Sequence, residues 1–538
     1  MKIRLAQINP IVGNLESNTH LIISKIKSSV EYDIIVFPEL SLTGYPPQDL
    51  LLDSNFIYQT AQMLESIKKI VEEQIVIIGF PRKKGHDLFN SAAVIKKGDI
   101  IGYHDKILLP TYDVFDEKRY FKSASSINPI KTEINGAPIS MGIQICEDLW
   151  DEDYNLRITD TLIEKGAEII INISASPYRK KILDKRLKLC IDRSNHLKYY
   201  FIYCNLVGAQ DELVFDGRSF IINSDGDIEC IGKAFEEDTI DFDSSQSNIC
   251  NHSKSQINQS EELFMALSLG VRDYFRKSSF SKAVIGLSGG IDSSLTAAIA
   301  VDAIGKQNVI GISMPSTFSS EHSKKDAASL AENLGIKFET IPINNIFKEL
   351  LGEMDSFFSG TESGLAEENL QARIRGNILM SIANKINALV LNTGNKTELA
   401  LGYCTMYGDM CGALGVISDL NKIEVYKISE WINDSRGDSV IPKNSIEKEP
   451  SAELKENQYD PFDYDIVSPI VDHIINDMLD QEALTKMGYD SALVKDIQSR
   501  IYQSEYKRRQ APPGIKVSEK AFGVGRRYPI INQYGKTK

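Results

Sequence analysis

The sequence lacks several patterns that would assign it to a common protein class at once. Its seven cysteines include no CxxC pair, which argues against a disulfide framework and a zinc ribbon. Its seven histidines include no HxxxH or HExxH motif, which removes the common zinc hydrolases. No stretch approaches the roughly 18 to 20 apolar residues that a membrane helix requires, and the first ten residues read as a strand rather than a secretion signal. We therefore expect a cytoplasmic protein without membrane contact.

Positive charge is also scarce. The chain has 74 Asp and Glu against 60 Lys and Arg, which gives a formal net charge of -14. Most of such a surface repels a polyanion, so nucleic acid is not an expected partner. With 42% hydrophobic and 25% charged residues, the composition is otherwise that of an average globular protein. Because 538 residues exceed one ordinary hydrophobic core, we expect two domains.

Short apolar runs in the first half are typical of buried strands, and the patterned segments 18–30 and 53–71 between them are typical of helices packed on a sheet. The runs are residues 33–37, 74–80, 140–146, 168–173 and 199–206. From about residue 236 to 262 the chain is too polar to bury enough surface to fold alone. The expected boundaries are 1–245 for the first domain, 246–262 for the linker and 263–538 for the second domain.

In the second half, strand and helix patterns alternate. The strand candidates are residues 282–288, 308–314, 337–343 and 388–394, and the helix candidates are residues 292–305, 320–335 and 368–386. This alternation predicts a parallel, doubly wound sheet.

The segment Leu287–Ser294 reads LSGGIDSS and lies between an apolar strand and a helix pattern. Gly289 and Gly290 allow close backbone approach, and the helix directs unpaired N–H groups at the turn, so we expect an anion there. The GK[ST] ending of a Walker A loop is missing. The SGGxDS pattern resembles the pyrophosphatase loop of the ATP pyrophosphatase family, whose members cleave ATP to AMP and pyrophosphate. The alternative is an ordinary strand-to-helix turn.

Cys146 ends an apolar strand at an exit that can present a side chain to a pocket. A lone cysteine is usually buried and inert. A thiol that attacks an amide needs a base and a cationic or N–H donor, and Glu39 and Lys106 can fill these roles. The segments around Glu39, Lys106 and Cys146 resemble the nitrilase superfamily. The resemblance implies that Cys146 is the nucleophile, Glu39 the general base and Lys106 the oxyanion stabiliser. Glu117 is either an additional acid or a structural ion-pair partner.

Three further segments extend the resemblance over essentially the whole chain: LNTGNKTELALGYCTMYGDMCGAL at 391–414, EENLQARIRG at 367–376 and YKRRQAPPG at 506–514. Together the segments resemble the glutamine-dependent NAD synthetases. The resemblance implies an α/β protein with an N-terminal nitrilase-like α-β-β-α sandwich and a C-terminal doubly wound parallel sheet of the ATP pyrophosphatase (adenine nucleotide alpha hydrolase-like) type. It also implies a ligase that forms NAD from deamido-NAD through a carboxyl adenylate, with ammonia passed between the domains, and a homo-oligomer paired through the synthetase domains.

The resemblance further implies the contacts of each substrate. ATP would bind Leu287, Ser288, Gly289, Gly290, Ile291, Asp292, Ser293, Ser294 and Thr393. Deamido-NAD would lie near Asn369, Glu398 and Lys507, and Asp292 and Glu398 would hold Mg²⁺. Glutamine would contact Tyr112, Ser176 and Lys181, although the Gly-Lys pair that such synthetases often carry after Ser-Pro-Tyr is replaced by Arg179, Lys180 and Lys181.

Other interpretations are open at this point. An ATP pyrophosphatase amidotransferase acting on a purine nucleotide or on aspartate is disfavoured by the nitrilase-like half and by the 391–414 block. A tRNA-thiolating relative is disfavoured by the acidic charge and the unpaired cysteines. A binding or scaffold protein with degenerate sites is disfavoured because both constellations are intact. The basic tail, 507–527, has seven Lys or Arg against one Glu and is either a phosphate-neutralising segment or simply solvated.

Overall fold

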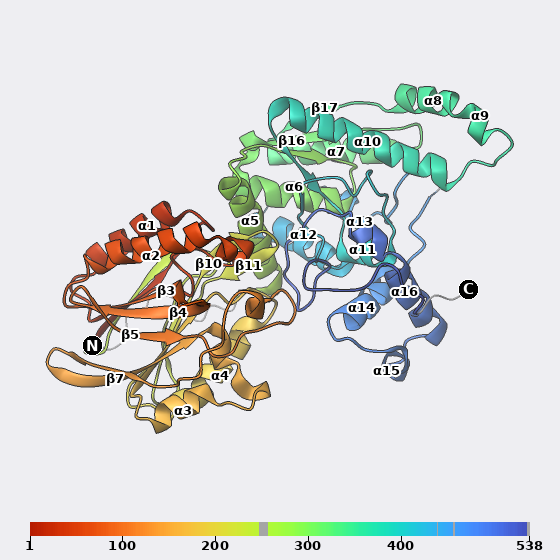
Figure 1. Ribbon diagram of the computed structural model, residues 1–538. Coiled ribbons are helices and arrows are strands. Elements are labelled where there is room, and N and C mark those ends of the chain that lie inside the picture. Colours follow the sequence, from red (N-terminus) through yellow and green to blue (C-terminus); the bar gives the residue numbers. More distant parts are fainter. Residues whose placement is uncertain (247–256, 438, 456–457, 535–538) are drawn as a thin grey trace. The chain divides into compact units, whose positions relative to one another are not determined.

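The computed structural model describes residues 1–246, 257–437, 439–455 and 458–534 (Figure 1). The chain divides into two compact units, Met1–Gln256 and Ile257–Lys538. Of the segment expected to link the domains, residues 247–256 lie outside the described residues, whereas residues 259–262 are the first four residues of helix α5 (Gln259–Lys277). No helix in the described ranges is long and apolar enough to cross a membrane.

Two six-stranded sheets form the first unit, and in each the central three strands are parallel and the outer ones antiparallel. The first sheet has the order β14 (Asp238–Asp243), β1 (Lys2–Gln7), β2 (Ile34–Val36), β3 (Ile75–Lys84), β4 (Asp87–Lys96) and β5 (Asp99–Asp105). The second has the order β13 (Ile228–Ile231), β12 (Phe220–Asn223), β9 (Tyr200–Asn205), β8 (Ile169–Ser174), β7 (Ala137–Ile145) and β6 (Ile130–Ile134). A separate hairpin joins β10 (Val207–Gln210) and β11 (Leu213–Asp216).

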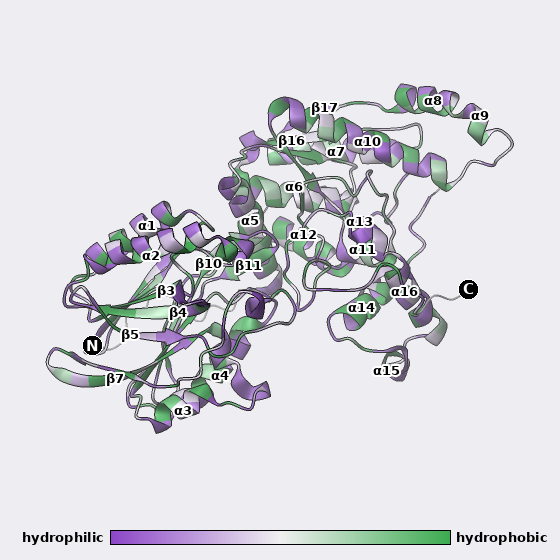
Figure 2. Ribbon diagram, in the orientation of Figure 1, coloured by the Kyte–Doolittle hydropathy of each residue, from purple (hydrophilic) through white to green (hydrophobic). Residues whose placement is uncertain are grey.

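The two sheets pack face to face, since one apolar cluster contains side chains of both, such as Ile3 and Val36 from one sheet and Ile143 and Ile171 from the other. Helices cover the outer faces. The helices α1 (Leu15–Lys27) and α2 (Ser54–Lys68) pack on the first sheet, where Leu64 of α2 belongs to a shared apolar cluster. The helices α3 (Ile158–Glu164) and α4 (Ile182–Ser194) pack on the second sheet. Figure 2 shows hydrophobic strands between helices of mixed hydropathy, as expected for buried strands and half-buried helices. The predicted α-β-β-α sandwich is therefore confirmed.

The second unit contains one sheet in which all strands are parallel. Its order is β17 (Lys337–Thr340), β16 (Val309–Ser313), β15 (Ala283–Gly286), β18 (Leu389–Asn392) and β19 (Leu414–Gly415). Both α6 (Ile291–Ile304) and α10 (Leu365–Ile386) pack against the sheet. The other helices named below are α7 (Glu321–Leu334), α8 (Asn344–Glu353), α9 (Asp355–Phe358), α11 (Lys396–Leu401), α12 (Lys422–Arg436), α13 (Lys443–Glu447), α14 (Tyr464–Ile475), α15 (Gln481–Lys486), α16 (Ser491–Gln503) and α17 (Glu505–Arg508). The predicted parallel, doubly wound sheet is confirmed.

The strand order fixes where a ligand can bind in the second unit. From β15 the chain crosses to β16 on one side, and β18 lies on the other side, so the direction of winding reverses between β15 and β18. In open parallel sheets the crevice beyond the carboxyl ends of such strands is the usual binding place. The loop 287–290 follows β15 and the loop 393–395 follows β18, so both line this crevice.

Candidate active sites

In the first unit, the loops that follow two strands meet at a buried ion pair. Glu39 follows β2 and Lys106 follows β5, and Lys106 Nζ lies 2.7 Å from Glu39 Oε1. Glu39 also accepts hydrogen bonds from Asn90 Nδ2 at 2.7 Å and from the Ala175 backbone N–H at 2.9 Å. Both contacts fix the carboxylate, and neither is visible in the sequence because Asn90 on β4 and Ala175 after β8 are distant from Glu39 along the chain.

Glu117 adds a second carboxylate to this pair. Its Oε1 accepts hydrogen bonds from Lys106 Nζ at 2.8 Å and from Tyr45 Oη at 3.1 Å. Burial raises the pKa of Glu117 to about 7, with Lys106 opposing the rise and Glu39 adding to it. Burial alone would lower the pKa of Lys106, but Glu117 and Glu39 outweigh it and hold that pKa well above its usual range. Lys106 is therefore an ammonium ion that bridges two buried carboxylates.

Cys146 lies within electrostatic reach of the same pair. It is the first residue of the 3-10 turn η3 (Cys146–Leu149) that follows β7, and its φ is 45°. Burial raises the pKa of the Cys146 thiol, Glu39 adds to the rise and Lys106 opposes it. The thiol consequently keeps its proton until a base removes it, and the carboxylate that affects it most is the one held by Lys106.

Asp148 connects the segment that carries Lys106 to the turn that carries Cys146. Its carboxylate accepts backbone N–H groups from Ile107 at 3.0 Å and Leu108 at 2.9 Å, and from Ile145 at 3.1 Å. The side chain is fully buried. The relative position of lysine and cysteine thus depends on hydrogen bonds around one carboxylate rather than on mobile loops.

The three residues expected to contact glutamine differ in burial and in hydrogen bonding. Tyr112 is half exposed, and its hydroxyl donates to Glu147, next to Cys146, at 3.0 Å. Ser176 is buried, and its hydroxyl accepts a hydrogen bond from Arg186 at 3.1 Å. Lys181 is exposed before α4, and its side chain has no hydrogen bond or ion pair with the part of the chain that the structure describes.

Arg179, by contrast, lies within electrostatic reach of Tyr112 and Asp113. Burial lowers the pKa of Arg179, Arg186 adds to the lowering, and Tyr112 and Asp113 oppose it. Arg179 therefore lies near Tyr112 of the expected glutamine site.

In the second unit, the loop 287–290 turns tightly into α6. Gly289 has φ +80°, and a Cβ there would lie 2.2 Å from the Ser323 carbonyl oxygen, so only glycine fits. Ser288 Oγ accepts the Gly290 backbone N–H at 3.1 Å and lies 3.2 Å from Ser293 Oγ. The hydroxyls of Ser293 and Ser294 both donate to the Gly290 carbonyl, at 3.0 and 2.9 Å, and both residues are buried. Ser288, Gly290 and Ser293 line a cavity beside the loop, whereas Gly289 and Ser294 do not.

Two cavities open beside this loop. The first, of about 280 Å³, contains most of the residues expected from the sequence: Ser288, Gly290, Ile291, Asp292, Ser293, Asn369, Thr393, Glu398 and Lys507. The second, of about 270 Å³, is lined by the apolar residues Leu287, Ile312, Met314, Leu379 and Val390 and by the polar residues Ser288, Lys448 and Ser451, among others. Both cavities share Ser288, Gly290, Asn392 and Thr393, so they meet at the loop. Gly289 and Ser294 are in neither wall.

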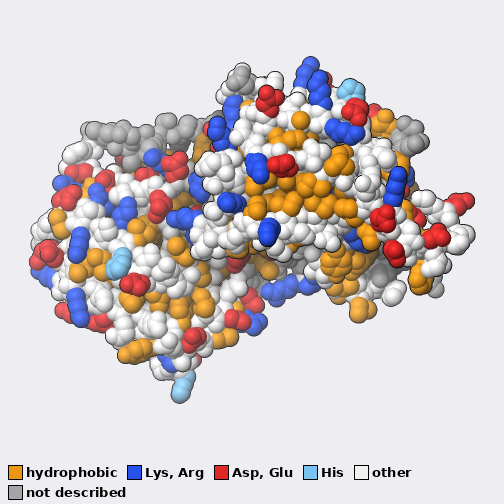
Figure 3. All heavy atoms as spheres, turned by 90° about the horizontal axis from the view of Figure 1, so that it is seen from above, with side chains coloured by type: hydrophobic (Ala, Val, Ile, Leu, Met, Phe, Trp, Pro, Cys, Tyr) orange, Lys and Arg blue, Asp and Glu red, His pale blue; other side chains and the backbone are white. Residues whose placement is uncertain are grey.

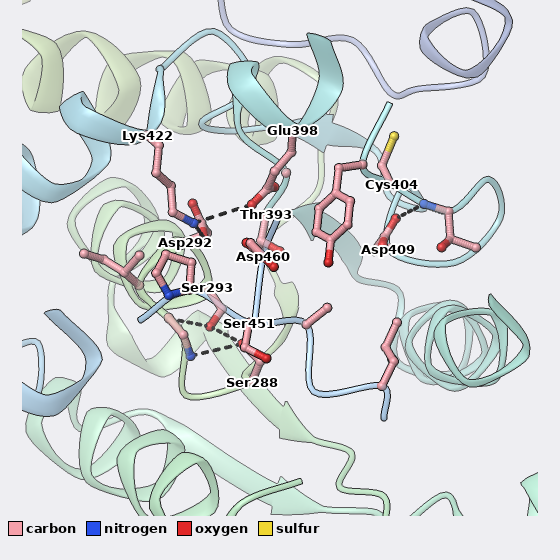
Figure 4. Close-up of a pocket in the computed structure, with 18 of the residues that line it drawn as sticks. Ser288, Asp292, Ser293, Thr393, Glu398, Cys404, Asp409, Lys422, Ser451 and Asp460 are labelled. Carbon is pink, nitrogen blue, oxygen red and sulfur yellow. Dashed lines mark hydrogen bonds and ion pairs between the residues drawn. The ribbon is translucent and has the colours of Figure 1, made fainter. Parts of the chain in front are cut away.

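Lys422 lies between the two carboxylates expected to hold Mg²⁺ (Figure 4). Its Nζ is 2.5 Å from Asp292 Oδ2 and 3.5 Å from Glu398 Oε1. Burial raises the pKa of Glu398 to about 8, Asp292 adds to the rise and Lys422 opposes it. Two carboxylates that already share one cation fit a magnesium ion, which commonly takes one or two protein carboxylates and completes its shell with phosphate and water. The described ranges contain no group of three or more His, Cys, Asp and Glu that could hold a metal ion.

Several residues that line these cavities were not predicted from the sequence. Lys422, Asp460 and Asp409 line the first cavity, and Arg375 lines the second. Asp409 belongs to the 391–414 block and Arg375 to the 367–376 segment, which were usable signals, whereas Lys422 and Asp460 lie in ordinary helix or loop sequence. Lys507 and Asn369 make internal contacts as well: Lys507 Nζ donates to the Gly402 carbonyl at 2.7 Å, and Asn369 Oδ1 accepts the Thr405 hydroxyl at 2.6 Å.

Comparison with known proteins agrees with this two-site arrangement. Residues 2–249 match the carbon-nitrogen hydrolase family, and residues 263–511 match the NAD synthase family. Glutamine-dependent NAD(+) synthetases of Synechocystis and Thermotoga maritima are 41% and 40% identical, each covering 99% of this chain and 99% of the relative.

Solved structures give the same result. A glutamine-dependent NAD+ synthetase from Acinetobacter baumannii in complex with ADP has a TM-score of 0.79 and 36% identity, covering 99% of this chain and 98% of that one. A glutamine-dependent NAD(+) synthetase from Cytophaga hutchinsonii has a TM-score of 0.86 at 21% identity over 99% and 98%, which supports the fold. Because relatives of 40% and 41% identity align over almost its entire length, the chain belongs to the family of glutamine-dependent NAD(+) synthetases.

Proposed function

We propose that this chain makes NAD(+) by ATP-dependent amidation of deamido-NAD, with glutamine as the nitrogen source. A carboxylate oxygen of deamido-NAD attacks the α-phosphorus of ATP, the bond to the bridging oxygen breaks, and pyrophosphate leaves. Ammonia then attacks the carboxyl adenylate, and AMP departs to leave the amide. The observation that carries the proposal is the presence, in one chain, of the Glu39–Lys106–Cys146 cluster and of the 287–294 loop beside Asp292 and Glu398.

The first unit supplies the ammonia in this proposal. Glu39 takes the proton of the Cys146 thiol, which burial keeps protonated at rest. The thiolate attacks the glutamine carboxamide, the oxygen charge is stabilised by Lys106, and ammonia leaves with a proton returned from Glu39. Water then hydrolyses the thioester to glutamate. Tyr112, Ser176 and Lys181 are the proposed glutamine contacts, and Arg179, which lies near Tyr112, is the alternative to Lys181.

The second unit activates the carboxylate. ATP would place its base against the apolar residues of the second cavity and its phosphates on the loop 287–294 and Thr393. Deamido-NAD would occupy the first cavity near Asn369, Glu398 and Lys507. Asp292 and Glu398 would hold Mg²⁺, which neutralises phosphate charge when bound.

Ammonia is proposed to pass from Cys146 to the second unit without release to solvent. The reason is chemical: near pH 7 released ammonia becomes mostly ammonium, which is not a nucleophile. Ammonia appearing in solution in amounts equal to the glutamine consumed would contradict this part.

A second copy of the chain is the proposed partner of the surface formed by α8, α9 and the exposed side of α10. The helix α8 has no buried residue, although Ile346 and Leu350 are large and apolar, and Phe357 on α9 is 85% exposed. Figure 3 views the second unit from the side that carries α7 and α10 and shows hydrophobic side chains gathered over a broad area. Exposed apolar areas of this kind usually mark an interface.

The decisive experiment measures NAD formation from deamido-NAD, ATP and Mg²⁺ with either glutamine or ammonium, for the wild type and for Cys146→Ala. The variant should lose glutamine-supported synthesis and keep ammonium-supported synthesis. Cys190→Ala, which changes a buried cysteine on α4 outside the cluster, is the matched control and should support both. A wild type that makes no NAD with either nitrogen source would refute the substrate assignment.

A further inference from the structure

The phosphate-binding loop has no cation of its own. Residues 287–294 contain glycines, hydroxyls and one carboxylate, but neither Lys nor Arg. Backbone N–H groups at a helix N-terminus bind phosphate, yet the bond that breaks in adenylylation leaves a highly charged pyrophosphate. A positive side chain that meets this charge must therefore come from another part of the chain.

Two neighbouring lysines already have acceptors within the chain. Lys422 is bound to Asp292 at 2.5 Å, and Lys507 donates to the carbonyls of Gly402 at 2.7 Å and Cys404 at 2.8 Å. Each of these ammonium groups already has a strong acceptor. Neither is in the wall of the second cavity, where the loop meets the proposed ATP position.

Lys448, which directly follows α13, is in the wall of both cavities together with Ser288 and Gly290. Its Nζ donates to Ser323 Oγ at 2.9 Å. Ser323 is also the residue whose carbonyl oxygen packs against Gly289. The ammonium group is thus anchored to the residue that supports the back of the phosphate-binding turn.

The charge of Lys448 is only weakly compensated. The ion pair with Asp326 Oδ2 is long, at 4.0 Å, and Glu453 Oε1 accepts the Ser323 hydroxyl at 2.6 Å. Burial lowers the pKa of Lys448, and Glu453 and Asp326 oppose this without reversing it. An anion in the cavity would supply the missing compensation.

We propose that Lys448 binds the β- and γ-phosphates of ATP and stabilises the leaving pyrophosphate. The inference rests on the proposed adenylylation. As the carboxylate oxygen bonds to the α-phosphorus, the bond between that phosphorus and the bridging oxygen breaks and its electron pair stays on pyrophosphate. The Lys448 ammonium neutralises this growing charge by hydrogen bonds and transfers no proton. It takes the position that a lysine at the end of a Walker A loop holds in other nucleotide-binding proteins.

The test compares Lys448→Met with the wild type in the full chain, using inorganic pyrophosphate with Mg²⁺ as the calorimetric probe and ammonium as the nitrogen source for NAD synthesis. Lys448→Met should weaken pyrophosphate binding at least about tenfold and lower kcat on the order of 10²- to 10³-fold, as for loss of one transition-state donor. KM for deamido-NAD should stay unchanged, and Lys448→Arg should recover part of both losses.

The matched control is Lys443→Met. Lys443 is an exposed residue of α13 that pairs with Glu447 at 3.1 Å, and it is in the wall of neither cavity, so this variant should behave as the wild type. Ser323→Ala removes the anchor while keeping the lysine and should weaken pyrophosphate binding by an intermediate factor.

Unchanged pyrophosphate affinity in Lys448→Met would overturn the proposal. If that variant does not fold, unchanged affinity in Ser323→Ala would overturn it instead. A wild type that binds pyrophosphate through Lys448 but makes no NAD would contradict the proposed function and leave this assignment standing.

Discussion

The Lys106 ammonium and the Glu39 carboxylate form an ion pair with 2.7 Å between Nζ and Oε1, and both side chains are almost completely buried. The desolvation cost of such a pair is met only because Glu117, Asn90 and the Ala175 amide add hydrogen bonds around it. Removal of one partner therefore has a structural effect and a chemical effect at once.

Lys106→Met should lower the rate of glutamine-supported NAD synthesis at least about 10³-fold, because the charge that develops on the carboxamide oxygen loses its cation. Ammonium-supported synthesis should stay within about twofold. The first unit should also lose about 3–5 kcal/mol of stability, since two carboxylates remain buried without their cation. Lys118→Met, an exposed lysine of the same segment, is the control and should change neither activity. Equal loss with both nitrogen sources would contradict the assignment.

Glu117 should make the stability of the first unit depend on pH. Burial raises its folded pKa to about 7 from 4.5, while Lys106 opposes the rise, so between these values the folded state holds a proton that the unfolded state has released. Stability therefore falls as pH rises from about 5 to 7. Glu117→Gln removes this pH-dependent component. The difference in the free energy of unfolding between wild type and variant should therefore change by at most about 3 kcal/mol between pH 5 and 7.

The measurement is denaturant unfolding followed by tryptophan fluorescence. The chain has two tryptophans, Trp150 in the first unit and Trp431 in the second, so a Trp431→Phe background reports on the first unit. Glu72→Gln, at an exposed glutamate, should keep the wild-type pH dependence. A parallel pH dependence of Glu117→Gln and wild type would refute the role of Glu117.

Local pattern was sufficient to predict the sheets and the two motif regions. The strand before Cys146 and the loop 287–294 are continuous in sequence, and their hydrophobic and glycine patterns report on the local backbone. The residues that complete the sites are far apart in the sequence. Asn90 contacts Glu39 across 51 positions, and Lys422 contacts Asp292 across 130. Such contacts depend on how the sheets and helices pack, which no single segment encodes.

The basic tail illustrates the same limit. Its charge suggested either phosphate neutralisation or simple solvation. Arg508 is instead buried and donates to the Leu399 carbonyl at 2.9 Å, and Arg526 pairs with Glu505 at 2.8 Å. These arginines attach the C-terminal segment to α11 and α17, a structural role that a count of charges cannot distinguish from the other two.

Asp292→Asn and Glu398→Gln should each raise the Mg²⁺ concentration for half-maximal synthesis by about tenfold or more, because one hard oxygen ligand loses its charge. In the metal-free protein, burial and Asp292 raise the pKa of Glu398 to about 8. Metal binding must displace that proton below pH 8, so the apparent Mg²⁺ affinity of the wild type should increase between pH 6.5 and 8.5. Asp302→Asn, on the same helix α6, should leave the titration unchanged. A Mg²⁺ requirement that is the same in all three variants would contradict the ligand assignment.

The apolar surface of α8 and α9 predicts a defined change in assembly. Leu350→Glu and Phe357→Glu place charges on side chains that are 39% and 85% exposed in the single chain, so neither should unfold the monomer. If a second copy covers this surface, each charge would be buried without a partner, and the complex should dissociate. Sedimentation of the wild type should give a multiple of 60.1 kDa, and the variants should move toward that single-chain mass. Val30→Glu, at an exposed apolar residue of the first unit, should sediment as the wild type does. Sedimentation of the wild type at 60.1 kDa would show that a second copy does not cover this surface.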